Sequence, residues 1–146
     1  MASVRQAPVQ GQAGVTALLL QMSRAIYRHT PESMLGMPLK EFAVLVILRD
    51  HGAASQQSMC EMMCVEANNM VLWLNDLEAA GHALRRRDPS DRRRHIVEIT
   101  AGGLEALERA ERAIEGVEDS VLAALDQEER RQLHHLLAKA LEAPRS

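Results

Sequence analysis

Apolar side chains recur every three or four residues along most of this chain, which is the spacing of one face of a helix. Leu18, Leu19, Met22 and Ile26 follow this spacing and predict a helix over residues 14–29. Two prolines and a glycine in the stretch TPESMLGMP predict that this helix ends there.

A second helix is predicted to begin at Pro38, because proline suits the first helical turn. Phe42, Leu45 and Leu48 would point toward the core from it. Its apolar run FAVLVIL also fits a buried strand by periodicity alone. The polar flanks and the lack of a partner run nearby favour the helix.

Two closely spaced helices are predicted next. Ser55 suits the N-cap of a short helix that runs to about Cys64. After a turn at Val65 and Glu66, a longer helix is expected over residues 67–80. Its apolar face consists of Met70, Trp73, Leu74 and Leu77. Gly81 follows at the position where helices commonly end in a left-handed residue, so this segment predicts a helix-turn-helix.

The segments HALRRRD and RHIVEIT predict two strands of a hairpin, because the second is rich in strand formers and PSDRR between them contains turn residues. Thr100 can then cap a long helix. A heptad-like seam for packing on another helix or chain comprises Leu107, Ala110, Ile114, Val117, Val121 and Ala124. Asp126 and Glu129 have capping-box spacing for a last helix, which carries Leu133, Leu136, Leu137 and Leu141.

Composition supports a mainly helical domain. Of the 146 residues, 47% are apolar, but Tyr27, Phe42 and Trp73 are the only aromatic ones. The core must therefore consist of aliphatic side chains and some of the eight methionines, which favour helix. We expect a mainly α fold with a small β-hairpin, as one compact domain with helical extensions.

Signals for membranes, secretion and disulfides are weak. No window of 18 apolar residues predicts a membrane span. The first twelve residues, MASVRQAPVQGQ, lack the apolar core of a signal peptide, and residues 1–11 predict a disordered tail. Cys60 and Cys64 are too few for a disulfide framework. The expected location is the cytoplasm.

Charge is distributed unevenly along the chain. The formal net charge is −3, yet residues 85–94 contain six arginines against Asp88 and Asp91. Residues 101–129 contain nine acidic residues against Arg109 and Arg112. A compact basic patch beside an acidic helix indicates a partner of negative charge at that patch.

A helix-turn-helix followed by a basic hairpin is the plan of a winged helix, in which the hairpin is called the wing. A helix fits the DNA major groove, which is about 12 Å wide. A flanking hairpin can reach the minor groove, which is narrow and electronegative in A·T tracts. Arginine suits that groove because its guanidinium stays charged and is weakly hydrated.

The stretch LEAAGHALRRRDPSDRRRHIVEIT resembles the multiple-antibiotic-resistance regulator (MarR) family. Leu77, Glu78 and Gly81 match its Leu-Glu-x-x-Gly pattern. The wing motif matches at Asp91 and Arg93 and at Ile99-Thr100, with Ile for Leu. The segment MPLKEFAVL is similar to the start of the second helix in the family. The resemblance extends in detail from about Met37 to Gly103.

The resemblance implies a homodimeric winged helix-turn-helix regulator that binds a pseudo-palindromic operator in double-stranded DNA. Residues 37–103 would form the DNA-binding region. Residues 12–36 and 104–146 would contain dimerisation helices. The implied activity is transcriptional repression that a small ligand relieves. The family pattern also implies that Asp91 orients Arg93, which would enter the groove.

Contacts with DNA are expected from two groups of side chains. The helix-turn-helix would contribute Ser55, Gln57, Ala67, Asn68, Asn69, Val71 and Leu72, and the wing would contribute Arg86, Arg92, Arg93 and Arg94. Asparagine can read adenine, but an asparagine pair at a helix start can also cap it, so both roles stay open. Leu72 replaces a polar or basic residue common in the family, and His82 and Ala83 replace a larger apolar pair.

Other functions remain to be weighed. In the family, a small anionic or lipophilic ligand often binds beside the dimerisation helices, where Arg24, Tyr27 and Arg28 are candidates. The sulfur-rich stretch MCEMMC, with Cys60 and Cys64, suits either buried packing or thiol and soft-metal sensing. A winged-helix protein-interaction module without DNA binding is the remaining alternative. The six histidines form no metal-ligand pattern, and no catalytic motif is present, so we expect neither a cofactor nor enzyme activity.

Overall fold

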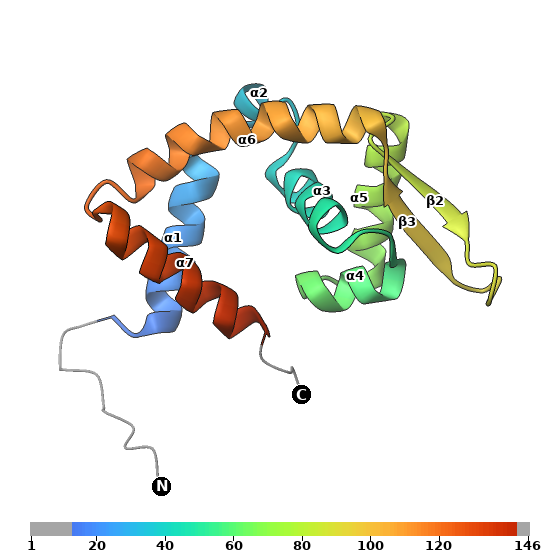
Figure 1. Ribbon diagram of the computed structural model, residues 1–146, viewed down its shortest axis with the longest axis horizontal. Helices are drawn as coiled ribbons and strands as arrows, with labels where there is room; N and C mark the ends of the chain where they lie inside the picture. Colours follow the sequence, from blue (N-terminus) through green and yellow to red (C-terminus); the bar gives the residue numbers. More distant parts are fainter. Residues whose placement is uncertain (1–12, 143–146) are drawn as a thin grey trace, which may run out of the picture. The chain divides into compact units, whose positions relative to one another are not determined.

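The computed structural model describes residues 13–142, so the predicted tail over residues 1–11 lies outside the described residues. Its elements are α1 (Val15–His29), α2 (Glu32–Leu35), α3 (Leu39–His51), β1 (Ala54–Ser55), α4 (Gln56–Met63), α5 (Ala67–Ala79), β2 (Ala83–Arg87), β3 (His95–Ile99), α6 (Ala101–Val121) and α7 (Gln127–Glu142). Figure 1 shows them in order of colour. The predicted fold class, mainly α with a small hairpin, is confirmed.

The chain forms two compact units. One unit is the continuous segment Thr30–Ile114, and the other combines α1 with the chain from Glu115 onward. The predicted helix-turn-helix and hairpin both belong to the first unit. Within residues 13–142, no helix is sufficiently long and apolar to cross a membrane.

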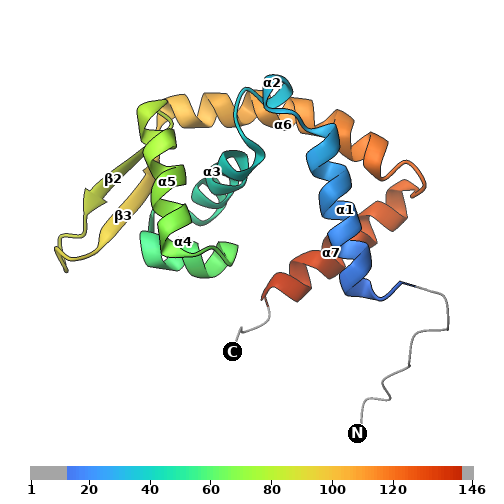
Figure 2. The ribbon, with the colours of Figure 1, turned by 180° about the vertical axis from the view of Figure 1, so that it is seen from behind.

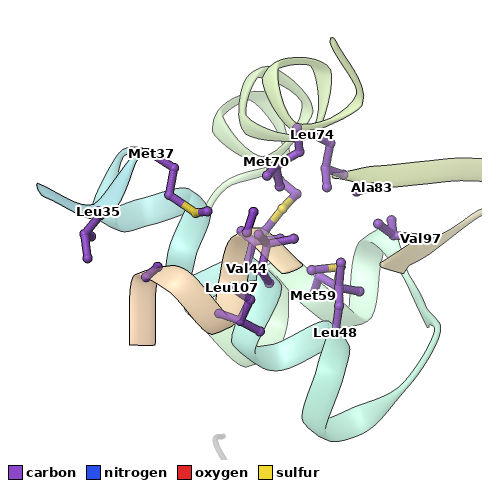
Figure 3. Close-up of a cluster of buried hydrophobic side chains, with 14 residues drawn as sticks. Leu35, Met37, Val44, Leu48, Met59, Met70, Leu74, Ala83, Val97 and Leu107 are labelled. Atoms are coloured by element: carbon purple, nitrogen blue, oxygen red, sulfur yellow. The ribbon is translucent and has the colours of Figure 1, made fainter. Parts of the chain in front are cut away.

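The core of the first unit is aliphatic and sulfur-rich, as the composition predicted. Side chains from α2, α3, α4, α5, α6 and the hairpin meet in this core (Figure 3). The largest fully buried side chains are Val44, Leu45, Leu48, Met59, Met70, Leu74, Leu77, Val97 and Leu107. Phe42 and Trp73 pack against this cluster but are only partly buried, so the aromatic residues lie at its margin.

A three-stranded antiparallel sheet supports the hairpin, with strand order β1-β3-β2. In the hairpin, Ala83 pairs with Ile99 and Arg87 pairs with His95. The strand β1 was not predicted, because two residues carry no periodicity. It pairs Ala54 with Val97 and therefore joins the start of α4 to the wing.

Local capping explains where α4 and α5 begin and end. The Ser55 hydroxyl accepts a hydrogen bond from the backbone N–H of Ser58 at 3.0 Å, which confirms the predicted N-cap. Cys64 ends α4 in the left-handed conformation, with φ of 54°. Gly81 ends α5 with φ of 77°, and the N–H of His82 donates to the Leu77 carbonyl at 2.9 Å. This is the glycine-terminated helix end that the sequence predicted.

Thr100 connects the hairpin to α6. Its hydroxyl donates to the Gly81 carbonyl at 2.6 Å and accepts from the backbone N–H of Gly103 at 2.9 Å. The predicted cap is therefore confirmed, and the same side chain also contacts the end of α5. The predicted helix break at TPESMLGMP is confirmed, because α1 ends at His29, but the stretch also contains the short helix α2, which was not predicted. The predicted seam was wrong at its last position, because Ala124 lies beyond the end of α6.

The second unit contains α1, the end of α6, and α7. The N–H of Asp126 donates to Glu129 at 2.9 Å and the N–H of Glu129 donates to Asp126 at 2.8 Å, which confirms the capping box. Arg130 closes the turn before α7 by binding Asp119 at 2.7 Å and the Leu122 carbonyl at 3.1 Å. Apolar side chains remain exposed on both terminal helices: Val15, Leu18, Leu19, Leu20, Met22, Leu136, Leu137 and Leu141.

Candidate nucleic-acid interface

The first turns of α5 present an exposed polar surface. Ala67, Asn68 and Asn69 are exposed, whereas Met70 on the opposite face is fully buried. The residue before the helix, Glu66, makes no side-chain cap, and no side-chain hydrogen bond involves Asn68 or Asn69 within residues 13–142. The amides are therefore available to an external partner rather than occupied in capping.

Two apolar residues continue this surface of α5. Leu72 is 59% exposed, although it is a large apolar side chain, and Val71 is half-buried. Leu72 lies three and four residues after Asn69 and Asn68, so all three share one helix face. The exposed face of this helix thus combines amides with one leucine.

The start of α4 faces the wing close to its tip, where β3 begins. Ser55, Gln56 and Gln57 line a hollow of about 160 Å³ together with Arg93, Arg94 and His95. The Ser55 hydroxyl is engaged with Ser58, whereas the Gln57 side chain is exposed. Gln56 and His95 were not among the predicted site residues. The sequence indicated these two residues only in that Gln56 follows Ser55 and His95 follows Arg94.

The wing tip is built by its two aspartates. The Asp88 carboxylate accepts from the N–H and the hydroxyl of Ser90 at 2.9 and 2.7 Å, and these bonds lower the pKa of Asp88. The N–H of Asp88 donates to the Arg94 carbonyl at 2.9 Å, and the N–H of Arg94 donates to the Asp91 carbonyl at 3.0 Å. These bonds close the tip and leave the arginine side chains outside it.

Asp91 contacts Arg93, the residue that the family pattern implies it orients, through the Arg93 backbone. Its carboxylate accepts from the backbone N–H of Arg93 at 3.0 Å. Within residues 13–142, no ion pair joins this carboxylate to the Arg93 guanidinium. Asp91 therefore orients the backbone at Arg93 and leaves the guanidinium available.

The six arginines are not equivalent. Arg85 is held against α5, where the Glu78 carboxylate accepts from its backbone N–H at 3.0 Å and from its Nε at 2.8 Å. This contact lowers the pKa of Glu78. The guanidinium also donates to Asn75. Because its side chain is only 20% exposed, Arg85 acts as a link within the fold.

The other five arginines are exposed. Arg86 pairs with Glu98 at 2.6 Å in a solvent-exposed contact, which is weak enough to exchange for another anion. In the described part of the chain, no ion pair involves the side chains of Arg87, Arg92, Arg93 and Arg94. Arg87 was not among the predicted contacts, although it belongs to the same run. The acidic partners of Arg85 and Arg86 come from α5 and β3, not from the acidic helix α6.

The candidate surfaces lie on one side of the segment Thr30–Ile114. In both views, α4, the first turns of α5 and the wing tip lie toward the lower edge of this segment (Figure 1, Figure 2). The exposed amides of α5 and the arginines of the wing can therefore face one extended anionic partner. Tertiary structure brings these elements together, since α5 and the wing tip are separated in sequence by β2.

The predicted ligand residues lie on α1. Arg24 and Arg28 line a shallow hollow with Gln21 and Ala25. Tyr27 is not part of that lining and is 60% exposed. The hollow presents two guanidinium groups beside an aliphatic surface.

The sulfur-rich segment is divided between core and surface. Met59 is fully buried, Cys60 is half-buried and Cys64 is exposed. Burial raises the pKa of the Cys60 thiol, which opposes formation of the reactive thiolate. Among residues 13–142, no group of three or more metal-ligating side chains occurs.

An exposed helix-turn-helix with an arginine-bearing hairpin defines a winged-helix protein. The model of the MarR family matches residues 37–95. A transcriptional regulatory protein for the hcr operon of Thauera aromatica is 31% identical over 98 residues, or 67% of this chain. The repressor NicR of Pseudomonas putida is 28% identical over 70% of this chain. Residues 37–95 therefore form a domain of the MarR family.

The aligned segments cover 59% and 65% of those two relatives, which is less than two thirds of their length. Both relatives are named as regulators of transcription, not as enzymes. A crystal structure of MarR matches this fold with a TM-score of 0.81 at 21% identity, covering 93% of this chain and 94% of that one. The structure of BpsR from Bordetella bronchiseptica, whose DNA binding is regulated by 6-hydroxynicotinic acid, matches with a TM-score of 0.74 at 25% identity. This match covers 94% of this chain and 100% of that one.

Proposed function

We propose that this protein is a transcriptional regulator that binds double-stranded DNA as a homodimer. The observation that carries the proposal is a set of exposed arginines in a wing that lies on the same side as the exposed turns of α5. In the described residues no acidic side chain pairs with Arg92, Arg93 or Arg94. A duplex with closely spaced phosphates is the partner that such a surface fits.

The two elements suit different grooves. The α5 helix would enter the major groove with Asn68, Asn69 and Leu72 toward the base edges. The wing would reach the adjacent minor groove with Arg93 at its tip, where a narrow groove concentrates negative potential. Asp91 would fix the backbone from which Arg93 extends.

The hollow between α4 and the wing suits a backbone phosphate. Gln56 and Gln57 supply N–H groups at the start of a helix, which attract anions. Arg94 and His95 add donors from the opposite wall. Contacts of this kind set the register of a protein on DNA without reading sequence.

Dimerisation would place two such surfaces on one duplex. Exposed apolar side chains on α1 and α7 are the features that support this part of the proposal. In this assignment, residues 12–36 and 104–146 join the subunits and residues 37–103 bind DNA. A two-fold dimer would recognise a pseudo-palindrome.

The last part of the proposal is that the protein represses transcription and that binding of a small ligand relieves this repression. NicR is named a repressor, and 6-hydroxynicotinic acid regulates BpsR. The Arg24 and Arg28 hollow is suited to a small anion with an apolar body. Fluorescence anisotropy tests this part by measuring whether 6-hydroxynicotinic acid displaces the protein from DNA. The native protein is compared with its Arg28→Gln variant.

The central experiment measures affinity for a pool of random-sequence duplexes and for duplexes enriched from it, from 50 to 200 mM salt. The slope of log affinity against log salt should be steep, at about −0.9 for each phosphate contacted. Arg93→Ala should weaken binding to the enriched duplex by about 1–3 kcal/mol per subunit. Arg112→Ala, an exposed arginine on α6 with the same change in charge, should leave affinity nearly unchanged.

Weak association that does not depend on salt would contradict DNA binding and favour a protein-interaction module. If Arg93→Ala binds with unchanged affinity and keeps the steep salt dependence, Arg93 does not contact the DNA, although the proposed DNA binding stands.

A further inference from the structure

The α5 helix carries no basic residue. Its sequence from Ala67 to Ala79 is ANNMVLWLNDLEA, in which Asp76 and Glu78 are the charged positions. The positive charge of this surface therefore comes from the wing, and the helix can contribute only amides and apolar groups to base recognition.

Two cations that contact α5, Arg85 and Lys40, are already engaged. Arg85 is bound by Glu78 and by Asn75, so its donors point into the fold. Lys40 lies over the Trp73 ring, with its Nζ 5.7 Å from the ring centroid. Neither side chain is placed to substitute for a basic residue on the exposed face of α5.

This distribution has a consequence for base recognition. Guanine is read in the major groove mainly by bidentate arginine or lysine, adenine by bidentate asparagine or glutamine, and the thymine methyl by apolar side chains. The exposed first turns of α5 present Asn68 and Asn69, which lack side-chain partners among residues 13–142, and the 59% exposed Leu72. Asp76, which could accept from cytosine, lies in the second half of the helix, whereas base contacts come from its N-terminal part.

We propose that α5 reads A·T base pairs, with Asn68 and Asn69 hydrogen-bonding adenine edges and Leu72 packing on a thymine methyl group. The inference rests on the proposed DNA binding and adds the chemical class of the half-site. Leu72 would also act against G·C pairs, because packing a leucine on their polar edges removes water without supplying a hydrogen bond.

The test begins with selection from a random-sequence duplex pool by the full-length protein and by its Leu72→Ala variant. Positions whose preference changes between the two selections are those that Leu72 reads, and they should be A·T. Each thymine at those positions is then replaced by uracil, which removes only the methyl group. Affinity should fall about fourfold for each methyl lost, as expected for burial of one such group.

Two variants make the result specific to Leu72. In Leu72→Ala the thymine and uracil duplexes should bind equally. Leu84→Ala removes a leucine of equal size and similar exposure, 58% against 59%, from the wing strand β2. That variant should keep the fourfold preference for thymine.

The outcomes separate this inference from the function on which it rests. Selection of G·C pairs at the positions sensitive to Leu72, or equal affinity of the native protein for thymine and uracil duplexes, would overturn A·T reading while DNA binding stands. Selection that enriches no sequence, with binding insensitive to salt, would overturn the proposed function itself.

Discussion

Among the glycines of residues 13–142, Gly103 is the one whose surroundings leave least room for a side chain. It lies in the first turn of α6, where its N–H is bound by Thr100. A Cβ atom at this position would be 2.1 Å from the carbonyl oxygen of His82 and 2.9 Å from Cγ1 of Ile99. Since the first contact is with backbone, a side chain there requires the end of α5 and the start of α6 to move apart.

We therefore expect Gly103→Ala to lower the free energy of unfolding by about 1–3 kcal/mol, the usual cost of overpacking. Gly116→Ala is the matched control, because it lies in the same helix and a Cβ atom there would meet nothing within 4 Å. The control should be neutral or raise stability by up to about 1 kcal/mol. Urea denaturation followed by circular dichroism measures both, and equal stabilities would contradict the packing shown at Gly103.

Between elements, the contact of Glu78 with Arg85 links α5 to the strand β2 of the wing. The Glu78 carboxylate binds the backbone N–H and the guanidinium of the same arginine. Because α5 and the wing each carry part of the proposed DNA surface, this link also sets the direction of the wing relative to α5.

We expect Glu78→Gln to destabilise the fold by about 1 kcal/mol at neutral pH. This is less than the usual contribution of a hydrogen bond to a charged group, because the pair is partly exposed to solvent. The pKa of Glu78 is lowered in the folded state by Arg85, so its contribution is present at neutral pH. This stabilisation decreases as the pH falls below 4.5, the ordinary pKa of a glutamate carboxyl, and is lost as the pH passes the lowered pKa of Glu78 in the folded protein. The stability difference between the native protein and Glu78→Gln should therefore shrink on acidification.

Glu98→Gln is the control for this prediction, since Glu98 pairs with Arg86 on a more exposed part of the same hairpin. It should change the unfolding free energy less at neutral pH. A difference between native and Glu78→Gln protein that is constant from pH 7 to pH 3 would show that the Glu78 charge contributes nothing.

At the scale of the whole molecule, the terminal helices leave more apolar surface exposed than the segment Thr30–Ile114 does. On α1, Leu18 is 53% exposed and Leu20 is 56% exposed; on α7, Leu136 and Leu141 are 60% and 66% exposed. Contiguous apolar surface of this kind is typically covered by a partner. A second copy of the chain is the partner that the proposed function requires.

Sedimentation analysis should therefore give a particle of twice the 16.2 kDa chain mass. Leu18→Glu should shift it toward monomer, because a carboxylate would have to be buried unpaired at the interface. Leu84→Glu, at a similarly exposed leucine on β2, should leave the dimer intact. A native protein that sediments as a monomer at micromolar concentration would contradict the assembly.

Features governed by neighbouring residues were predictable from the sequence. The caps at Ser55, Thr100 and Asp126 involve hydrogen bonds between residues three apart, so their spacing identifies them. The break after α5 follows from Gly81, and the apolar face of α5 follows from helical periodicity. The short elements α2 and β1 were missed, because four or two residues contain no periodic signal.

The chemistry of the arginine run depended on tertiary structure. In the sequence, Arg85 and Arg93 are members of one basic patch. Only the folded hairpin brings Arg85 against Glu78, and only the tip turn directs the Asp91 carboxylate to the backbone of Arg93. The sequence by itself determined the order of the longer helices and of the two hairpin strands, the caps and the winged-helix plan, since these arise from local spacing and burial. The tertiary structure decided which arginines support the wing and which remain available to DNA, because that division depends on strand register and on side chains distant in sequence.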